Sequence, residues 1–341
     1  MNSKLEVEEL KKNFLFSYRK KFPRESSSAI AKSTVTLLRK ILARESPKTL
    51  NDLQVSLNGH CRRLYGAQQS ELIFINVGLM ISKLARDELV QKNGAPDDKD
   101  MYVLWREEDA ANENQKKMEL ADVKRELQVS IKELASEIDA VREGVAAQSM
   151  ELLFNNDVVM VYSLGSSKTL QAFFQHSLDA GRRHKVIEIA DDDEELEKGP
   201  KFGRQIQLYE AASEMEKASK LVLVAAIYFP DGTCIVPAGG EQLALLAKRR
   251  QIPVYVLAPF YKLCPINMAN PAMLHTCRGV PLPFNLSTST GLVDCSEPAF
   301  DRLASDLVTY YVNSSSYLIP SHINTYKSDY YNCHDIAEYP Q

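Results

Sequence analysis

Apolar residues in the first part of the chain recur every three or four positions, which is the spacing of an amphipathic helix. This pattern predicts four helices, over residues 4–22, after the serines at 26–28, after Thr49, and over 70–90. The last of these is apolar on nearly every side, which favours a position in the centre of a helical bundle. The pattern therefore predicts an all-helical N-terminal region.

Residues 107–149 continue the helical pattern over a much longer stretch. Apolar side chains recur there at intervals of three, four or seven, at Leu120, Leu127, Ile131, Leu134, Ile138, Val141 and Val145. This spacing fits a free coiled coil, and it also fits one long helix that packs along a bundle. Because a strand pattern begins shortly afterwards, we place the end of the helical domain near Gln148.

The stretch from Asp157 to Phe174 (DVVMVYSLGSSKTLQAFF) changes the pattern from helix to strand. Its apolar run at 158–162 is short and rich in β-branched residues, as in a strand that is buried on both faces. Small residues follow, and the hydroxyl of Ser166 or Ser167 is suited to cap the next helix. In an open α/β sheet, such a strand-to-helix turn is where ligands bind.

Further strand patterns follow at regular intervals. They lie at residues 186–189, 205–208, 221–226 and 253–257. Because helical patterns separate these strands, the sequence predicts a parallel sheet. The predicted fold class is therefore α/β, with an N-terminal helical bundle over residues 1–148 that ends in a long helix. A Rossmann-like parallel-sheet domain follows over residues 149–341.

Charge is distributed unevenly along the chain. Residues 1–65 carry 14 Lys and Arg against 6 Asp and Glu, whereas residues 151–341 carry 16 against 22. A basic helical segment is suited to an acidic protein surface or to nucleic acid, and it is also typical of a solvated helix face. Aromatic residues do not interleave with the basic ones, as a stacking platform for single strands requires. We therefore expect no sequence-specific contact with nucleic acid.

The six cysteines are scattered and form no CxxC pair. The N-terminus lacks the apolar core of a signal peptide, and no apolar run approaches the roughly 20 residues of a membrane span. These features predict a cytoplasmic protein with free thiols and no contact with the membrane.

The motifs favour neither a cofactor nor a metal. No G-x-G-x-x-G follows the first strand and no Walker loop occurs, so we expect no nucleotide site of those kinds. The acidic run at 191–195 could bind Ca²⁺ or Mg²⁺, but its carboxylates are consecutive and enclose no glycine, which favours a solvated loop. His275 with Cys277, and Cys333 with His334, each lack a second pair at the spacing of a zinc site.

Ser163 follows the first strand at the position of a strand-end nucleophile. Its activation would need a base, such as His176 or His184, and an orienting carboxylate, and nothing in the spacing shows that these groups converge. A structural serine in a turn of small residues is the alternative. Lys262 follows a later strand and could hold a phosphate, or it belongs to an ordinary turn.

The order and spacing of several segments resemble those of a known family. They are TVTLLRKIL at 34–42, AQQSELIFINVGLMISKLARDE at 67–88, the stretch 157–174, EQLALLAKRRQIPVYVLAPFYKL at 241–263, and EPAFDRLASDLVTYYVN at 297–313. In these segments the chain resembles the regulatory subunits of eukaryotic translation initiation factor 2B, the guanine-nucleotide exchange complex for initiation factor 2. The ending SSYLIPSHINTYKSDYY, at 315–331, is most similar to the beta subunit.

The same family includes isomerases that act on ribose bisphosphate and methylthioribose phosphate. These enzymes use a Cys and an Asp, and the resemblance implies that Ser163 and Ala226 are the corresponding positions of this chain. A hydroxyl and a methyl group make proton transfer on a sugar implausible at this site. We therefore predict a protein that is not an enzyme, with a vestigial crevice at Ser163, Gly165, Ser166, Ala226 and Asp231. A sugar-phosphate isomerase of the same fold is the alternative.

The resemblance also implies a set of partners. In the family, regulatory subunits assemble with one another and with two larger catalytic-type subunits. Their helical domains engage the alpha subunit of initiation factor 2 and sense its phosphorylation. The resemblance implies the same role here, with the delta subunit and the catalytic-type subunits as partners and an allosteric mechanism. A self-assembling regulatory homodimer outside translation is a further hypothesis.

Overall fold

The computed structural model describes residues 2–20, 26–47, 50–93, 113–190, 202–277 and 297–337. The chain forms two compact units. The helical unit comprises Met1–Val141, Leu263–Ile266 and Thr325–Gln341, and the sheet unit comprises Arg142–Lys262 and Asn267–Asn324. The domains predicted at 1–148 and 149–341 are continuous stretches, whereas each unit is assembled from separate parts of the chain.

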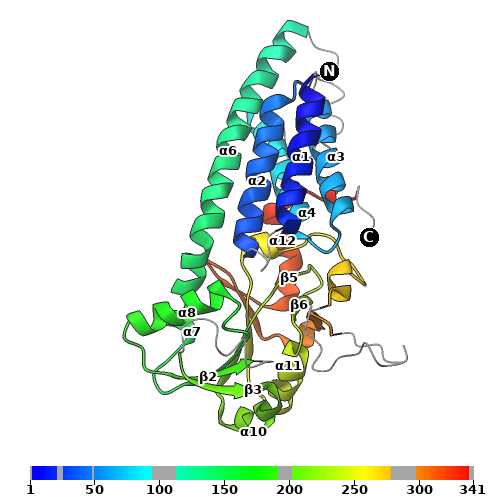
Figure 1. Ribbon diagram of the computed structural model, residues 1–341. Helices are drawn as coiled ribbons and strands as arrows, with labels where there is room; N and C mark the ends of the chain where they lie inside the picture. Colours follow the sequence, from blue (N-terminus) through cyan, green and yellow to red (C-terminus); the bar gives the residue numbers. More distant parts are fainter. Residues whose placement is uncertain are drawn as a thin grey trace, which may run out of the picture. The chain divides into compact units, whose positions relative to one another are not determined.

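The described helices of the helical unit are α1 (Asn2–Lys20), α2 (Ser27–Arg44), α3 (Leu50–Ala67), α4 (Ile73–Asn93), α6 (Glu113–Ala147), α12 (Ile323–Tyr330) and α13 (Cys333–Ala337). The first five of these lie side by side in Figure 1. The first four confirm the helices predicted from apolar spacing, and Ser26 caps α2 through a hydrogen bond from the Ala29 amide. The long helix predicted over 107–149 is present as α6.

Helix α4 occupies the centre of this unit, as its apolar sequence predicts. Every residue from Ile73 to Ser82 is buried, and α4 packs against both α2 and α3. Gly78 permits the close approach to α3, because a Cβ atom there would lie 2.2 Å from the Cys61 sulfur. The close packing of α4 against α3 therefore depends on glycine at position 78, which has no side chain.

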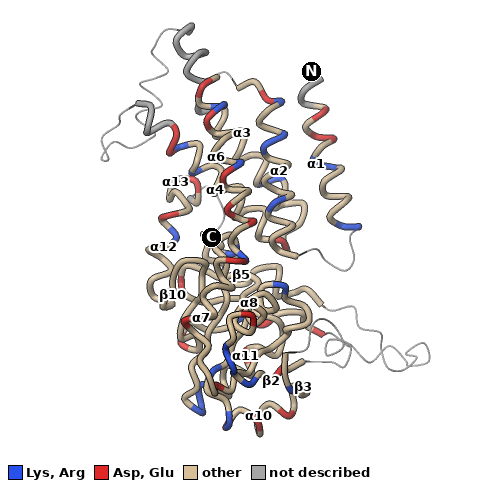
Figure 2. The backbone as a smooth tube through the Cα atoms, turned by 90° about the vertical axis from the view of Figure 1, so that its left-hand side faces the viewer, with Lys and Arg blue, Asp and Glu red and all other residues tan. Residues whose placement is uncertain are grey.

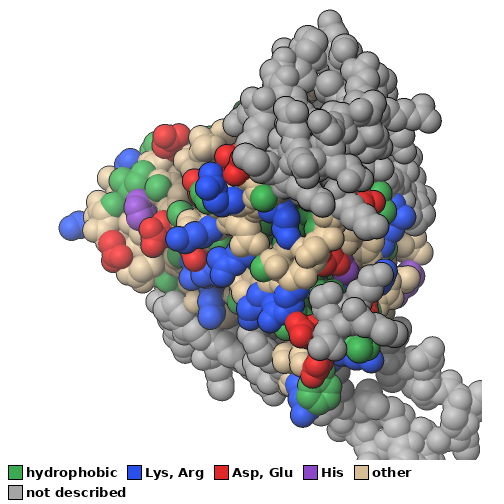
Figure 3. Space-filling model, turned by 90° about the horizontal axis from the view of Figure 1, so that it is seen from above, with side chains coloured by type: hydrophobic (Ala, Val, Ile, Leu, Met, Phe, Trp, Pro, Cys, Tyr) green, Lys and Arg blue, Asp and Glu red, His purple; other side chains and the backbone are tan. Residues whose placement is uncertain are grey.

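The basic excess of the N-terminal segment is concentrated on α2. This helix contains Lys32, Arg39, Lys40 and Arg44 and no acidic residue, and Figure 2 shows basic positions recurring along it. Figure 3 views the molecule of Figure 1 from above and shows Lys and Arg side chains gathered in the middle of the surface that is turned to the viewer. In the described part of the chain, no helix is long and apolar enough to span a membrane.

The sheet unit is built on a seven-stranded sheet in the order β10-β9-β7-β4-β1-β2-β3. The strands are β1 (Val158–Tyr162), β2 (Lys185–Ala190), β3 (Arg204–Gln207), β4 (Lys220–Val224), β7 (Val254–Leu257), β9 (Tyr310–Val312) and β10 (Tyr317–Leu318). All of their pairings are parallel except that of β10 with β9. The predicted α/β fold class, a helical bundle followed by a mainly parallel sheet, is confirmed.

Helices and a second sheet complete this unit. The helices are α7 (Ser149–Leu152), α8 (Lys168–Asp179), α10 (Ala211–Glu214) and α11 (Gly240–Arg249). The second sheet is antiparallel, in the order β5-β6-β8, and consists of Ile227–Tyr228, Cys234–Pro237 and Phe300–Leu303. The apolar pattern did not predict it, because strands of two to four residues are too short to show a period.

Strand β1 lies where the order of the parallel strands reverses. Starting from β1, the chain first adds β2 and β3 on one side and then β4 and β7 on the other. In open α/β sheets this reversal opens a crevice at the carboxyl ends of the two central strands. The predicted crevice therefore corresponds to the carboxyl ends of β1 and β4.

Candidate functional site

The turn after β1 holds Ser163 in a conformation that its neighbours impose. Its backbone φ is +59°, in the left-handed region that L-residues with a side chain rarely adopt. The side chain is 5% exposed, and its hydroxyl lies 2.7 Å from that of Ser166. The Ser163 amide donates to the Ile189 carbonyl at 3.1 Å. The geometry matches a structural serine in a tight turn.

The remaining polar groups of this turn are also bonded within it. The Gln171 amide nitrogen donates to the carbonyls of Leu164 and Gly165, both at 3.0 Å. The Ser166 hydroxyl donates to the Ser163 carbonyl at 3.1 Å. Ser167, rather than Ser166, caps α8 by accepting from the Leu170 amide. The turn therefore stabilises the start of α8.

Ala226 and Asp231 occupy different places. Ala226 follows β4, the neighbour of β1, and its amide donates to the Ile235 carbonyl at 2.7 Å. Asp231 lies in the turn between β5 and β6, where Oδ1 accepts from the Thr233 amide and hydroxyl and Oδ2 accepts from Arg302 at 3.3 Å. Of the predicted residues, Ser163, Gly165 and Ser166 thus share one turn, and Asp231 serves another.

The histidines considered as bases for Ser163 lie at the opposite edge of the sheet. Val158 pairs with Lys185 in the parallel β1–β2 ladder, so His184 is at the amino edge, roughly 20 Å along the strands from Ser163. His176 lies near the end of α8, and its Nδ1 is 3.2 Å from the Ser149 hydroxyl. Burial lowers the pKa of His184, although the charge of Asp157 opposes this shift. Neither ring is placed to activate Ser163.

An internal carboxylate takes the anion position at the start of α11. The Asp301 carboxylate accepts from the Gly239 amide at 2.6 Å and from the Glu241 amide at 3.4 Å. Free amides at a helix N-terminus are the groups that bind phosphate in many α/β proteins. Lys262, the residue considered as a phosphate ligand, is 5% exposed and donates to the Ala225 carbonyl at 2.8 Å. The amides at the start of α11 and the ammonium group of Lys262 therefore both bind groups of the protein itself.

The described residues contain no cluster of three or more His, Cys, Asp or Glu side chains that could hold a metal ion. The Cys277 thiol contacts the carbonyl of His275, not its ring. Burial raises the pKa of Cys61, Cys234 and Cys264 to about 12, so these thiols are not reactive nucleophiles. The acidic run at 191–195 and the side chain of His334 lie outside the described residues.

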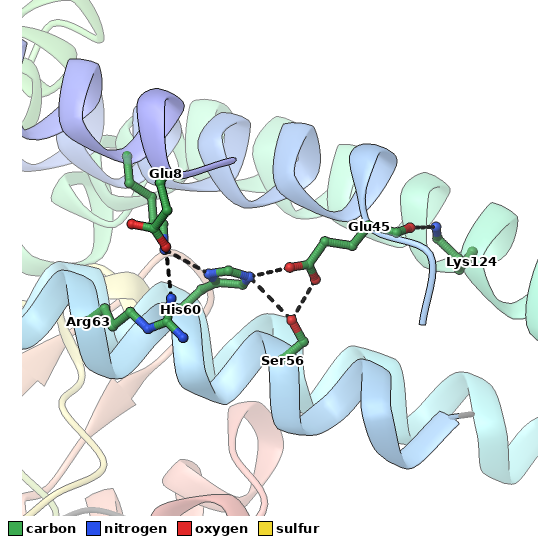
Figure 4. Close-up of polar contacts among 7 residues, drawn as sticks. Glu8, Glu45, Ser56, His60, Arg63 and Lys124 are labelled. Carbon is green, nitrogen blue, oxygen red and sulfur yellow. Dashed lines mark hydrogen bonds and ion pairs between the residues drawn. The ribbon is translucent and has the colours of Figure 1, made fainter. Parts of the chain in front are cut away.

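The helical unit contains a groove that no sequence pattern above indicated. Its volume is 740 Å³, and it is lined by α1, by residues 45–47 after the end of α2, and by α3. Figure 4 shows the polar side chains that converge beside it, with His60 at their centre. The His60 ring is buried, and its Nε2 lies 2.7 Å from Glu45 Oε1 and 3.3 Å from the Ser56 hydroxyl.

The hydrogen bonds around His60 assign its tautomer. Lys11 donates to Nδ1 at 3.3 Å, so Nε2 carries the proton and donates to Glu45. Ser56 donates to the other oxygen of Glu45 at 2.6 Å. In a catalytic triad, the carboxylate and the hydroxyl bind opposite ring nitrogens. Here both bind the same nitrogen, so the arrangement is not that of a nucleophile and its base.

Ion pairs extend this cluster and tie the helices together. Glu8 accepts from Lys11 at 2.5 Å and from Arg63 at 2.8 Å. Burial raises the pKa of Glu45, but hydrogen bonds from His60 and Ser56 outweigh it, and the net shift is downward. A polar stripe on α3 at Ser56, His60 and Arg63, which lies beside its apolar stripe, is the signal that could have revealed the cluster.

A second buried polar site closes the helical unit with residues from the end of the chain. Arg86 of α4 donates two hydrogen bonds to Asp335 of α13, at 2.9 and 2.7 Å, and the two side chains are 8% and 1% exposed. Gln54 and Asn58 of α3 also donate to Asp335. A buried carboxylate on which four hydrogen bonds converge is a structural anchor, because removing it would leave several buried donors unpaired.

Comparisons with known proteins agree with this architecture. A family model described as the initiation factor 2 subunit family matches residues 24–190 and 209–315. The translation initiation factor eIF2B subunit beta of Dictyostelium discoideum is 27% identical over 223 residues, which cover 61% of this chain and 56% of that protein. The chain therefore spans little more than half the length of this curated relative.

Solved structures share the fold. The eIF2B beta structure from Chaetomium thermophilum has a TM-score of 0.74 at 19% identity, covering 98% of this chain and 94% of that one. A chain of the tetrameric eIF2B-beta2-delta2 complex from the same organism has a TM-score of 0.69 at 19% identity, covering 96% and 95%.

The relation in fold to sugar-phosphate isomerases is also present. The 5-methylthioribose 1-phosphate isomerase from Pyrococcus horikoshii OT3 has a TM-score of 0.55 at 15% identity, covering 95% of this chain and 87% of that one. At these identities the structures show the fold, and the family model supplies the assignment. The chain belongs to the initiation factor 2 subunit family.

Proposed function

We propose that this chain is a non-catalytic regulatory subunit of the guanine-nucleotide exchange factor for translation initiation factor 2. Membership of the initiation factor 2 subunit family supports this role. The observation that carries the proposal is the state of the crevice after β1 and β4. Ser163 is bonded within its own turn, and Asp301 occupies the anion position of α11. In such a crevice the polar groups form hydrogen bonds within the protein and are not available to a sugar substrate.

The partners in this proposal are the other subunits of the exchange factor, with the delta subunit and the two catalytic-type subunits foremost. The tetrameric Chaetomium thermophilum complex combines beta and delta subunits, which supports this choice. A second partner is initiation factor 2 itself, whose alpha subunit the helical unit helps to bind. The complex works in the cytoplasm, and no sequence-specific contact with nucleic acid is involved.

The mechanism is allosteric. The chain performs no covalent chemistry and instead contributes binding free energy that differs between the unphosphorylated and phosphorylated forms of initiation factor 2. Such a difference shifts the exchange factor between productive and inhibited states, and by linkage each state prefers one form of the substrate. The basic α2 fits a surface that meets an acidic partner.

Co-purification tests the assembly. The tagged full-length chain, isolated from cells that carry it, should bring down the exchange-factor subunits and initiation factor 2. The Ser163→Ala variant is the matched control, because a change in the crevice should leave these partners unaffected. Recovery of the chain without any of these proteins would refute the translation role and favour a regulatory homodimer outside translation.

A nucleotide-exchange assay tests the regulatory part. The exchange complex reconstituted with this chain should be inhibited by phosphorylated initiation factor 2, and the complex lacking it should lose most of that inhibition while retaining exchange activity. Equal inhibition with and without the chain would assign phosphorylation sensing to other subunits.

The alternative function, isomerisation of a phosphorylated sugar, has its own test. The purified chain is incubated with ribose bisphosphate and with methylthioribose phosphate, and the products are followed by NMR. No turnover is expected, because a hydroxyl without a base replaces the thiol of the enzymes and a methyl group replaces their carboxylate. Turnover that disappears in Ser163→Ala would establish the enzyme instead.

A further inference from the structure

The groove between α1 and α2 differs from two other grooves that the described residues of the helical unit form. Its volume is 570 Å³. Leu10 and Phe14 of α1 and Leu37 of α2 supply apolar side chains, and Lys32, Thr36 and Lys40 of α2 form one rim. Among the described residues that line it, none is Asp or Glu. It is therefore an apolar surface with a positive edge.

The aromatic side chains on the floor of this groove pack against the buried helix α4. The Phe14 ring packs against Phe74 of the buried α4, with ring centroids 5.5 Å apart. The Tyr18 ring meets the same Phe74 edge-on at 5.2 Å, and its hydroxyl donates to Glu71 at 2.8 Å. Because Phe74 is fully buried, the floor is preorganised, and little ordering is needed when a ligand binds.

The rim places its charges at regular intervals. Lys32, Thr36 and Lys40 are separated by four residues each, so they lie along one face of α2. Lys32 is 44% exposed and pairs with Asp139 of α6. Lys40 is exposed and, within the described part of the chain, its ammonium group has no hydrogen-bond or ion-pair partner. Its charge remains available to a ligand.

Two other grooves of this unit carry acidic groups. Glu8, Glu45 and Asp52 line the groove beside His60. A further groove, of 410 Å³, is lined by residues that include Glu133 and Glu137 of α6. Each lining also includes one Lys or Arg, Arg63 in the first groove and Lys83 in the second, but acidic residues outnumber it, which disfavours an acidic ligand. The α1–α2 groove is suited to it, because opposite charges attract and the apolar floor supplies burial.

We propose that the α1–α2 groove binds an acidic amphipathic helix of a partner protein. The eight-residue separation of Lys32 and Lys40 corresponds to about 12 Å of helix, which is the length of roughly two turns. A helix with apolar residues at positions i, i+3 or i+4, and i+7 would place them on the floor. Its acidic flanks would face Lys40 and the rest of the basic α2.

This inference goes beyond the proposed function, because it assigns a surface and a partner chemistry that subunit assembly alone does not specify. Its test uses the isolated full-length chain, so its result is separate from that of co-purification. The probe is a fluorescein-labelled peptide of about 18 residues, with Leu at the helical spacing above and Glu at the intervening positions. A second peptide carries Lys in place of every Glu.

Fluorescence anisotropy measures both peptides against the purified chain. We expect the acidic peptide to bind and the lysine peptide to bind at least about tenfold more weakly, with acidic-peptide affinity falling as salt is raised. The Lys40→Glu variant should weaken the acidic peptide by about tenfold. Lys12→Glu is the matched control, since Lys12 is exposed on α1 but does not line the groove. It should change affinity less than about twofold.

A gain-of-function variant completes the design. Thr36→Lys inserts a third cation between Lys32 and Lys40 and should tighten acidic-peptide binding by a few-fold. Circular dichroism establishes that each variant is folded. The proposal is overturned if the two peptides bind equally, if neither binds, or if Lys40→Glu and Lys12→Glu have the same effect.

Discussion

The carboxyl edge of the sheet and the α1–α2 groove both present polar side chains next to an apolar interior, yet they use these groups differently. At the sheet edge, Ser163 is bonded to Ser166, and Asp301 accepts from the amides that begin α11. In the groove, the ammonium group of Lys40 forms no hydrogen bond or ion pair with a described residue. A buried polar group that is hydrogen-bonded inside the fold supports stability, whereas an exposed group without an internal partner is available to a ligand.

Polar sites that are bonded internally occur in both units, so the difference does not separate one unit from the other. The helical unit also contains closed polar sites, since Asp335 is held by Arg86, Gln54 and Asn58. Substitution at a closed site should therefore lower the free energy of unfolding in either unit. Substitution at the open groove should change affinity and leave stability nearly unchanged. Four variants test this distinction, in order of decreasing expected change in the free energy of unfolding.

The largest effect is expected at the buried ion pair of the helical unit. Asp335→Ala leaves the guanidinium of Arg86 buried without its carboxylate, which should lower the free energy of unfolding by about 3–5 kcal/mol. Urea denaturation followed by circular dichroism measures it. Asp329→Asn removes an exposed carboxylate of the same C-terminal segment and is the control. A change as small as that of the control would mean that the segment does not anchor the unit.

A smaller loss is expected in the turn after β1. Ser163→Val places a β-branched side chain at a φ of +59° and should destabilise the protein by about 2 kcal/mol. Ser163→Gly relieves the strain but removes the hydroxyl bonded to Ser166, so it should remain within about 1 kcal/mol of the parent. Equal stability of the two variants, in the same denaturation experiment, would contradict a turn limited by backbone conformation.

The ion pair at the amino edge of the sheet should give a pH-dependent effect. Burial raises the pKa of Asp157, but hydrogen bonds from Lys220 and the Phe154 amide outweigh it, and the net shift is downward. A carboxyl group with a lowered folded-state pKa stabilises the fold above its unfolded-state pKa of about 4. This contribution is lost as the pH falls through the folded-state pKa.

Asp157→Asn should therefore lower the free energy of unfolding by about 1–2 kcal/mol at neutral pH. The difference from the parent should shrink once the pH falls below about 4. Denaturation curves recorded at a series of pH values measure it. Glu151→Gln, which removes an exposed carboxylate of the same unit, is the matched control. A difference that is constant across this range would assign the effect to packing and not to charge.

The smallest effect on stability is expected at the open groove. Lys40→Glu should change the free energy of unfolding by less than about 0.5 kcal/mol, because Lys40 is exposed and its ammonium group is bonded to no described residue. The same variant should lose most of its affinity for the acidic peptide. A large loss of stability would show that Lys40 supports the fold, as the internally bonded polar groups do, and would contradict the distinction between the two sites.

Much of the fold could be predicted from local patterns. The apolar run at 158–162 predicts β1 with the bounds that the structure shows, and the spacing of Leu53, Leu57, Cys61 and Leu64 predicts the buried face of α3. These patterns succeed because helix and strand periods express burial within a few neighbouring residues. The site was predicted less completely, since Ser163, Gly165 and Ser166 share a turn while Asp231 serves the β5–β6 turn.

The class of the fold, the order of its helices and parallel strands, and the excess of positive charge in the N-terminal segment can all be predicted from the amino-acid sequence. The pairing of the buried polar groups, in contrast, depends on tertiary packing. Arg86 and Asp335 are 249 positions apart, and Asp301 reaches the start of α11 from a strand 62 positions away. No local period records such pairings, because they depend on how distant elements pack. The same packing leaves Lys40 open and engages Ser163, and this difference is the basis for proposing a partner surface at one and a structural role at the other.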